Sequence, residues 1–249
     1  MPDLQPLLQS LLESGRYSDL TISCEGRKFA VHRAIVCCQS SFFDAAVKGG
    51  FKAASSQIDL PDDELATIQR VVTFLYIRDY DDTGVPDIED KKSVSGEDKG
   101  SHAVLLDNLG VFIAADKFDI APLKQLARTR LINWIDENAQ RLPFVVPEIW
   151  VTLPPLETEL RDAIIKAISY HAQEFLNNDE SIAILTDLPA IAIAVLKKKL
   201  MRIFFSNFNC RGCECEGGVD NDTVMYTALN SSVSIQSSMI SYSASFPNT

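Results

Sequence analysis

The chain has 249 residues, of which 46% are hydrophobic and 23% are charged, and its formal net charge is −11. This hydrophobic content is enough for the core of one large or two modest globular domains, which excludes a chain dominated by disorder. The negative charge repels phosphate backbones and anionic lipid surfaces, so we expect no direct binding to nucleic acid or to a membrane.

The first predicted element is a short helix with one leucine face. Its leucines recur at i, i+3, i+4, i+7 and i+8, which is the spacing of residues along one side of a helix. They are Leu4, Leu7, Leu8, Leu11 and Leu12. An apolar face of this size has to be buried, either against the rest of the chain or against a partner.

Residues 20–31 predict a β-hairpin. Apolar and polar side chains alternate in the period-two pattern of a half-buried strand, with Leu20, Ile22 and Cys24 as the apolar positions. A Glu-Gly turn leads into a second strand, and His32 then opens a helix. We expect the nitrogens of His32 to bond nearby backbone, since no nucleophile and orienting acid lie near it in the sequence.

A second short helix, a third strand and a longer helix are predicted next. Ser40 and Ser41 are candidate N-caps of the short helix, which a glycine pair at 49–50 ends. Residues 57–60 are predicted to form the strand, and residues 62–76 a capped helix with one buried apolar side.

An acidic segment follows that helix. Residues 79–100 contain eight acidic and three basic residues, a net charge of 3 − 8 = −5, and almost no apolar side chains. Such a composition cannot bury enough surface to fold alone. We interpret residues 79–102 as a solvated insertion between two helices, with a regulatory acidic loop as the alternative.

Two helices over residues 105–118 and 123–136 are predicted to form a hairpin that closes the first domain at residue 137. The prolines between residues 142 and 155 are interpreted as a linker that opens a helical extension over residues 138–208.

The last predicted helix, residues 188–208, carries lysines and an arginine between apolar positions. We interpret it as a bundle helix with a solvated basic face, with a membrane-surface helix as the alternative. Residues 209–249 are rich in polar and small residues and are predicted to be a flexible tail.

Two motifs resemble the BTB/POZ family. The runs A-V-H-R-A-I-V at 30–36 and S-S-F-F at 40–43 resemble the opening of that domain, and Q-I-D-L-P-D-D at 57–63 resembles its third strand and next helix cap. The run A-A-D-K-F-D-I at 114–120, with a later Leu-Lys pair, resembles the family signature A-D-K-Y-x-I-x-x-L-K. The resemblance covers roughly residues 1–131 and is greatest to BTB proteins of filamentous fungi. It implies an α+β fold in which a small sheet lies beside a helical cluster.

The resemblance also implies a protein–protein interaction function. In this family the first helix packs across a dimer axis, so the leucine face would contact a second copy of the chain or another BTB protein. An acid at the first strand and a base after the histidine form a charged pocket at the dimer centre, and Asp19 and Arg33 match those positions. The alternative for this pair is an acid at the start of a strand and an exposed arginine.

Some family members recruit a cullin scaffold and act as substrate adaptors of a ubiquitin ligase. The corresponding contact segment here includes Phe51, Lys52 and Ala53. Cullin-binding members often carry a hydrophobic-x-Glu motif, so Ala53 in place of glutamate weakens this expectation. The substrate protein is not identifiable from the sequence, and a BTB-type transcriptional co-regulator is an alternative function.

No enzyme motif is present, and we expect neither catalysis nor a cofactor. The only metal-like spacing, Cys210, Cys213 and Cys215, lacks a fourth ligand, so the alternative of a zinc-dependent interaction module needs a partner chain, Asp220 or Asp222 to complete the site. The other cysteines, Cys24, Cys37 and Cys38, are interpreted as small buried hydrophobes. Without a secretory signal or a bilayer-spanning stretch, the chain is expected to be intracellular, cytoplasmic or nuclear.

Overall fold

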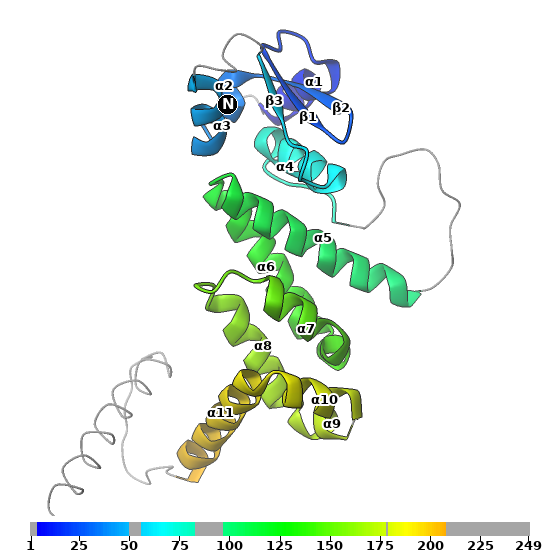
Figure 1. Cartoon of the computed structure of the whole chain (residues 1–249), viewed down its shortest axis with the longest axis vertical. Helices are drawn as coiled ribbons and strands as arrows, with labels where there is room; N and C mark the ends of the chain where they lie inside the picture. Colours follow the sequence, from blue (N-terminus) through cyan, green and yellow to red (C-terminus); the bar gives the residue numbers. More distant parts are fainter. Residues whose placement is uncertain (1–3, 50–55, 83–96, 178, 208–249) are drawn as a thin grey trace, which may run out of the picture. The chain divides into compact units, whose positions relative to one another are not determined.

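The computed structural model describes residues 4–49, 56–82, 97–177 and 179–207 (Figure 1). Residues 1–203 form one compact unit, which contains every described element except the end of the last helix. Residues 138–203 therefore share a compact unit with residues 1–137. The predicted tail, 209–249, lies outside the described residues.

A three-stranded sheet forms the β part of the fold. The strands are β1 (Leu20–Cys24), β2 (Arg27–Val31) and β3 (Gln57–Asp59), in the order β2-β1-β3. β1 pairs antiparallel with β2, so that Leu20 lies opposite Val31, and parallel with β3. The turn residues Glu25 and Gly26 have φ angles of 47° and 81°. The predicted hairpin is confirmed, and the buried positions of β1 alternate as its sequence indicates.

Four helices accompany the sheet. They are α1 (Gln5–Ser14), α2 (Arg33–Val36), α3 (Ser41–Lys48) and α4 (Leu65–Ile77). Ser40 is the N-cap of α3, as predicted, and its Oγ accepts a hydrogen bond from the backbone N–H of Phe43 at 3.1 Å. α4 begins three residues later than expected, after Glu64, and its N-cap makes no side-chain hydrogen bond.

The predicted helical hairpin is formed by α5 (Glu97–Lys117) and α6 (Ala121–Glu137). Phe118 lies in the turn between them and joins the hairpin to α3, since its ring stacks on Phe43 with the ring centroids 5.0 Å apart. The carbonyl of Phe118 also accepts the Ser40 hydroxyl at 2.6 Å. The two sequence motifs therefore meet in the core of one domain.

The acidic segment is anchored at both described ends. On one side Tyr80 is only 4% exposed, and Arg130 of α6 donates to the Tyr80 carbonyl and to the Asp79 carboxylate. On the other side residues 97–102 belong to α5. The solvated insertion predicted over 79–102 is thus shorter at both ends, and residues 83–96 lie outside the described part.

The prediction of a proline-rich linker was wrong. A short 3₁₀ helix (Ala139–Arg141) leads directly into α7 (Leu142–Thr152), which contains two of the prolines. Pro143 occupies the first turn, where its missing N–H costs nothing, and the apolar side of α7 is buried. Arg161 donates to the carbonyls of Trp150 and Leu153, which satisfies the end of the helix.

Four further helices complete the described chain. They are α8 (Glu159–Tyr170), α9 (Ala172–Leu176), α10 (Asp179–Asp187) and α11 (Pro189–Asn207). α8 packs on α6, and α10 packs on α7. Among the described residues, no helix is long and apolar enough to cross a membrane.

Candidate interaction site

The leucine face of α1 is divided between the core and the solvent. The helix begins with Pro6 in its first turn and ends at Gly15, whose φ of 60° gives the left-handed C-cap. Leu8 and Leu12 pack against the domain core, where α1 lies on α4. On the other side of the same face, Leu4 and Leu7 remain 63% and 57% exposed.

Two further contacts fix α1 in place. The side-chain amide of Gln5 donates to the carbonyl of Ile77, at the end of α4, over 2.8 Å. At the other end of α1, a methyl group on Gly15 would lie 3.1 Å from Cβ of Ala30, so the glycine allows a close approach to β2. The exposed leucines therefore project from a helix that is anchored at both ends.

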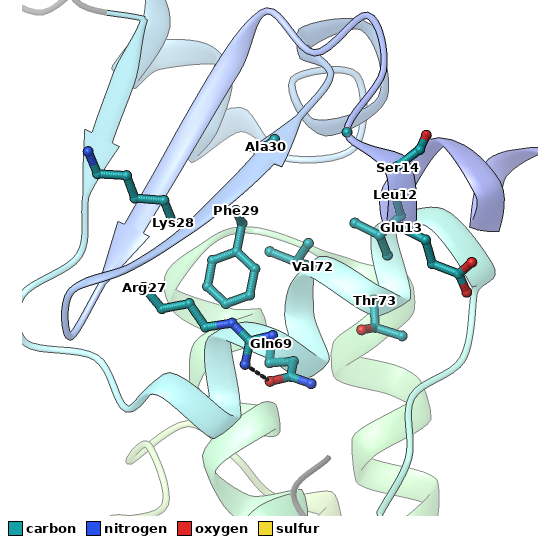
Figure 2. A pocket seen from close by; sticks show the side chains of 11 residues that line it. Leu12, Glu13, Ser14, Arg27, Lys28, Phe29, Ala30, Gln69, Val72 and Thr73 are labelled. Atoms are coloured by element: carbon teal, nitrogen blue, oxygen red, sulfur yellow. Dashed lines mark hydrogen bonds between the residues drawn. The ribbon is translucent and has the colours of Figure 1, made fainter. Parts of the chain in front are cut away.

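A pocket of about 450 Å³ adjoins this helix (Figure 2). Its walls come from the end of α1, from β2 and from α4, and Leu12 belongs both to the pocket and to the leucine face. Arg27 lies across the pocket wall, where its Nη1 donates to Oε1 of Gln69 at 2.9 Å and its guanidinium stands 5.3 Å from the ring centre of Phe29 (Figure 2). The lining mixes apolar and charged side chains, as the margin of a protein interface does.

Asp19 and Arg33 lie side by side, but their charged groups are not paired with each other. The Asp19 carboxylate accepts the backbone N–H of Arg33 at 2.8 Å, so it satisfies a free donor at the start of α2. The guanidinium donates instead to the Asp19 carbonyl at 3.2 Å and to the Ser56 hydroxyl at 2.9 Å. Both side chains reach solvent, and the dimer pocket implied for them remains a prediction.

His32 has a structural role in this region. Its Nε2 lies 2.7 Å from the carbonyl of Arg16, and its Nδ1 lies 2.7 Å from the hydroxyl of Tyr76. Because a carbonyl only accepts, the neutral ring carries its proton on Nε2 and accepts at Nδ1 from the tyrosine. One nitrogen thus bonds backbone, as expected, and the other bonds a side chain 44 residues away, a partner that sequence proximity could not indicate.

Several predicted site residues lie outside the described part of the chain. They are the cullin-facing residues Phe51, Lys52 and Ala53 and the tail cysteines Cys210, Cys213 and Cys215. Within the described ranges, no three histidine, cysteine or acidic side chains gather as metal ligands would. No cofactor-binding residue was predicted.

The three described cysteines differ from one another. Cys24 is buried, its thiol lies 3.0 Å from the Asp63 carbonyl, and burial raises its pKa. Burial also raises the pKa of Cys37, which is half-buried. Cys38 is exposed, so its assignment as a buried hydrophobe was wrong. It lies in the turn that follows the end of α2, on the solvent side.

The first part of the chain matches a known class of protein-interaction domain. Residues 8–92 match the family model of the BTB/POZ domain, and the chain therefore contains a BTB/POZ domain. That domain has the α+β architecture described above, in which a small sheet lies beside a helical cluster.

Two curated relatives share this part of the chain. The human Kelch repeat and BTB domain-containing protein 4 is 34% identical over 73 residues, which are 29% of this chain and 14% of that protein. The Arabidopsis thaliana BTB/POZ and MATH domain-containing protein 5 is 27% identical over 126 residues, which are 50% of this chain and 30% of that protein. The matches thus span less than a third of these relatives.

Two solved structures were also found to be similar to half of the chain. The BTB domain of zebrafish PATZ1 has a TM-score of 0.35 at 13% identity, with coverage of 50% of this chain and 87% of that domain. The BTB domain of human gigaxonin has a TM-score of 0.33 at 16% identity, with coverage of 51% and 92%.

Proposed function

We propose that this chain is a protein-interaction module that forms a homodimer through α1. The observation that carries the proposal is the divided leucine face. Leu8 and Leu12 hold α1 on the domain, while Leu4 and Leu7 stay mostly exposed on a rigidly held helix. Two such helices related by a twofold axis would cover each other's exposed leucines, as an isologous interface requires.

The leucines alone do not account for a stable dimer. Covering Leu4 and Leu7 on both protomers would gain on the order of 4–7 kcal/mol, because each side chain is already partly buried and full burial is worth about 1.5–3 kcal/mol. Association costs about 4–15 kcal/mol in lost freedom of movement. The interface must therefore extend beyond α1, and the neighbouring pocket along β2, which shares Leu12 with the leucine face, supports that extension.

The test is a pair of substitutions confined to the exposed part of the face. Leu4→Asp with Leu7→Asp places charges where a dimer needs apolar contact, yet the side chains that hold α1 on the core are unchanged. Sedimentation velocity should show monomer for this variant and dimer for the wild type, with equal helical circular dichroism.

The matched control is Leu156→Asp, which makes the same chemical change at a leucine that is 92% exposed in the loop before α8. This control should remain dimeric. A dimer that survives the double substitution in α1 would contradict the proposed interface.

The finer role that we propose is that of a substrate adaptor for a cullin-based ubiquitin ligase. This role rests on the family resemblance of the segment with Phe51, Lys52 and Ala53. A glutamate at position 53 could add a charge-assisted hydrogen bond worth about 1.5–3 kcal/mol, which is a tenfold to hundredfold gain in affinity. Weak binding is therefore expected of the natural chain.

Calorimetric titration of the full chain against a cullin N-terminal domain checks this role. Ala53→Glu should tighten binding and Phe51→Ala should abolish it. If Ala53→Glu still does not bind, the chain is an oligomerisation module without cullin. If Phe51→Ala binds as well as wild type, the contact lies elsewhere.

A further inference from the structure

The C-terminal helices enclose an apolar groove that the proposed dimer does not use. A cavity of about 360 Å³ lies among α8, α9, α10 and α11, and eight of its nine lining residues are apolar. Leu176 and Leu196 stand at its margin with exposed fractions of 55% and 59%. A groove of this kind is unusual on a surface that has no partner.

The groove continues as an apolar stripe along α11. Ile193 and Leu200 are 54% and 56% exposed, and with Leu196 they follow the spacing i, i+3, i+7. This stripe is about 10 Å long, or two helical turns. Ile191 and Val195 of α11 are buried and hold the helix in place, and Val195 also lines the groove. The exposed stripe is thus presented by a fixed helix.

Basic side chains border the stripe on both sides. Lys197 and Lys199 flank Leu196 and Leu200 on the helix surface, and Lys199 also lines the groove. The whole of α11 contains no acidic residue, although the chain has a net charge of −11. This helix is therefore a local basic surface on an acidic protein, which is a charge pattern that selects an acidic partner.

Arg202 of α11 lies on the side of the helix that holds Val195, and it contacts α8. The guanidinium of Arg202 lies 4.1 Å from the ring centre of Tyr170 in α8. Such cation–π stacking is attractive, since the ring face carries partial negative charge. The contact therefore joins α11 to α8 and helps to hold α11 in place.

We propose that this groove binds an amphipathic helix of a partner protein, whose apolar side enters the groove and whose flanking acidic side chains pair with Lys197 and Lys199. Apolar grooves between helices receive amphipathic helices through anchors at i, i+3, i+4 and i+7. The concave shape favours this occupant over a membrane, since a lipid surface contacts the convex apolar side of a helix. The site is independent of α1.

The experiment selects helices by their flanking charge. A display library of peptides of about 18 residues carries leucine at i, i+3, i+4 and i+7, with flanking positions varied among glutamate, glutamine and lysine. The full chain is the bait for selection. The full chain with Leu196→Glu and Leu200→Glu is used for counter-selection, so that peptides that bind outside the groove are discarded. Both leucines are exposed, so the variant should fold.

We expect glutamate to be enriched at the flanking positions. The selected peptide should lose at least about tenfold in affinity for Leu196→Glu with Leu200→Glu and for Lys197→Glu with Lys199→Glu. A lysine-flanked version of the peptide should bind Lys197→Glu with Lys199→Glu more tightly than it binds the wild type. Leu156→Asp serves as the unaffected control, and Leu4→Asp with Leu7→Asp should bind as wild type even if it is monomeric.

Three results would overturn the proposal. The first is that no peptide is enriched whose binding is lost in Leu196→Glu with Leu200→Glu, or that lysine is enriched at the flanking positions. The second is binding of the full chain to phosphatidylcholine vesicles only when they contain phosphatidylserine, lost in Lys197→Glu with Lys199→Glu, which would make α11 a membrane surface. The third is self-association that Leu196→Glu with Leu200→Glu abolishes, which would make a second copy the occupant.

Discussion

At the scale of single residues, two buried tyrosines link parts of the chain that are far apart in sequence. Tyr80 donates to Oδ1 of Asn108 in α5 at 2.6 Å, and Arg130 of α6 stacks 4.2 Å from the centre of its ring. Tyr76 in α4 binds both the backbone N–H and the ring of His32. Burial raises the pKa of Tyr76 and raises that of Tyr80 to about 12.

Tyr80→Phe tests the role of this buried hydroxyl. Because the pKa of Tyr80 is higher in the folded state, the tyrosine contributes its full stabilisation below the unfolded pKa of about 10. This contribution is lost as the pH rises from about 10 toward 12, because in that range only the unfolded state releases the proton. The wild type should lose about 1.4 kcal/mol per pH unit in this window from Tyr80 alone. The phenylalanine variant should lack that loss.

Urea unfolding of both proteins at pH 8, 10 and 11 measures the difference. At pH 8 the variant should be less stable by about 1–3 kcal/mol, since Oδ1 of Asn108 loses its donor. This gap should narrow above pH 10. The same slope in both proteins would mean that Tyr80 already ionises in the folded state.

At the scale of elements, α7 forms in spite of its prolines because its apolar side is buried. Pro147 lies inside the helix and has no N–H to donate to the carbonyl of Pro143. The side chains of Val145, Val146 and Ile149 are almost fully buried, and their burial outweighs the lost hydrogen bond. Tertiary packing thus makes α7 helical although its prolines disfavour a helix locally.

Pro147→Ala should therefore stabilise the protein. The ring of Pro147 faces solvent, so its removal leaves no cavity, while the backbone regains one helical hydrogen bond. Part of this gain is offset by the greater freedom of the unfolded chain. We expect a net gain on the order of 1–2 kcal/mol in the free energy of unfolding by urea denaturation. A loss of stability would show that the proline positions α7 in a way that alanine does not.

The elements that could be predicted are those with a strong local pattern. The alternation at Leu20, Ile22 and Cys24 indicates a strand because one side of it meets the core, and the serine N-cap of α3 depends only on neighbours three residues away. α7 could not be predicted, since its stability comes from contacts distant in sequence. Periodicity also defined the leucine face of α1 without showing that Leu8 and Leu12 pack against the chain's own core.

At the scale of the whole molecule, a buried ion pair joins the hairpin of α5 and α6 to the helices that follow. Arg128 of α6 donates to Oε2 of Glu157 at 3.0 Å, and the side chains are 14% and 5% exposed. The other carboxylate oxygen of Glu157 lies 3.4 Å from the backbone N–H of Leu160, at the start of α8. One carboxylate therefore binds both α6 and α8.

Glu157→Ala should destabilise the fold by about 3 kcal/mol or more, because it leaves the Arg128 cation buried without its main partner. Glu159 offers a matched control, since it also contacts Arg128, at 3.5 Å, but is 61% exposed. Glu159→Ala should change the free energy of unfolding by less than about 1 kcal/mol. Equal effects in urea denaturation would show that the pair does not join these helices.

The interaction surfaces were only partly predictable at this scale. The sequence indicates the leucines of α1 and the lysines of α11, because both repeat along a helix. The pocket beside β2 and the groove of α8–α11 depend on how distant segments meet, and periodicity holds no information about that. The basic helix was expected to present a solvated face, whereas the structure also exposes an apolar stripe there.

In the proposed homodimer, two copies of the chain meet through the exposed leucines of α1. Multi-angle light scattering of the full chain at micromolar concentration, beside Leu4→Asp with Leu7→Asp, tests it most directly. We predict a mass near twice 27.6 kDa for the wild type and near 27.6 kDa for the variant. A wild-type mass near 27.6 kDa, or the same doubled mass for both proteins, would contradict this claim.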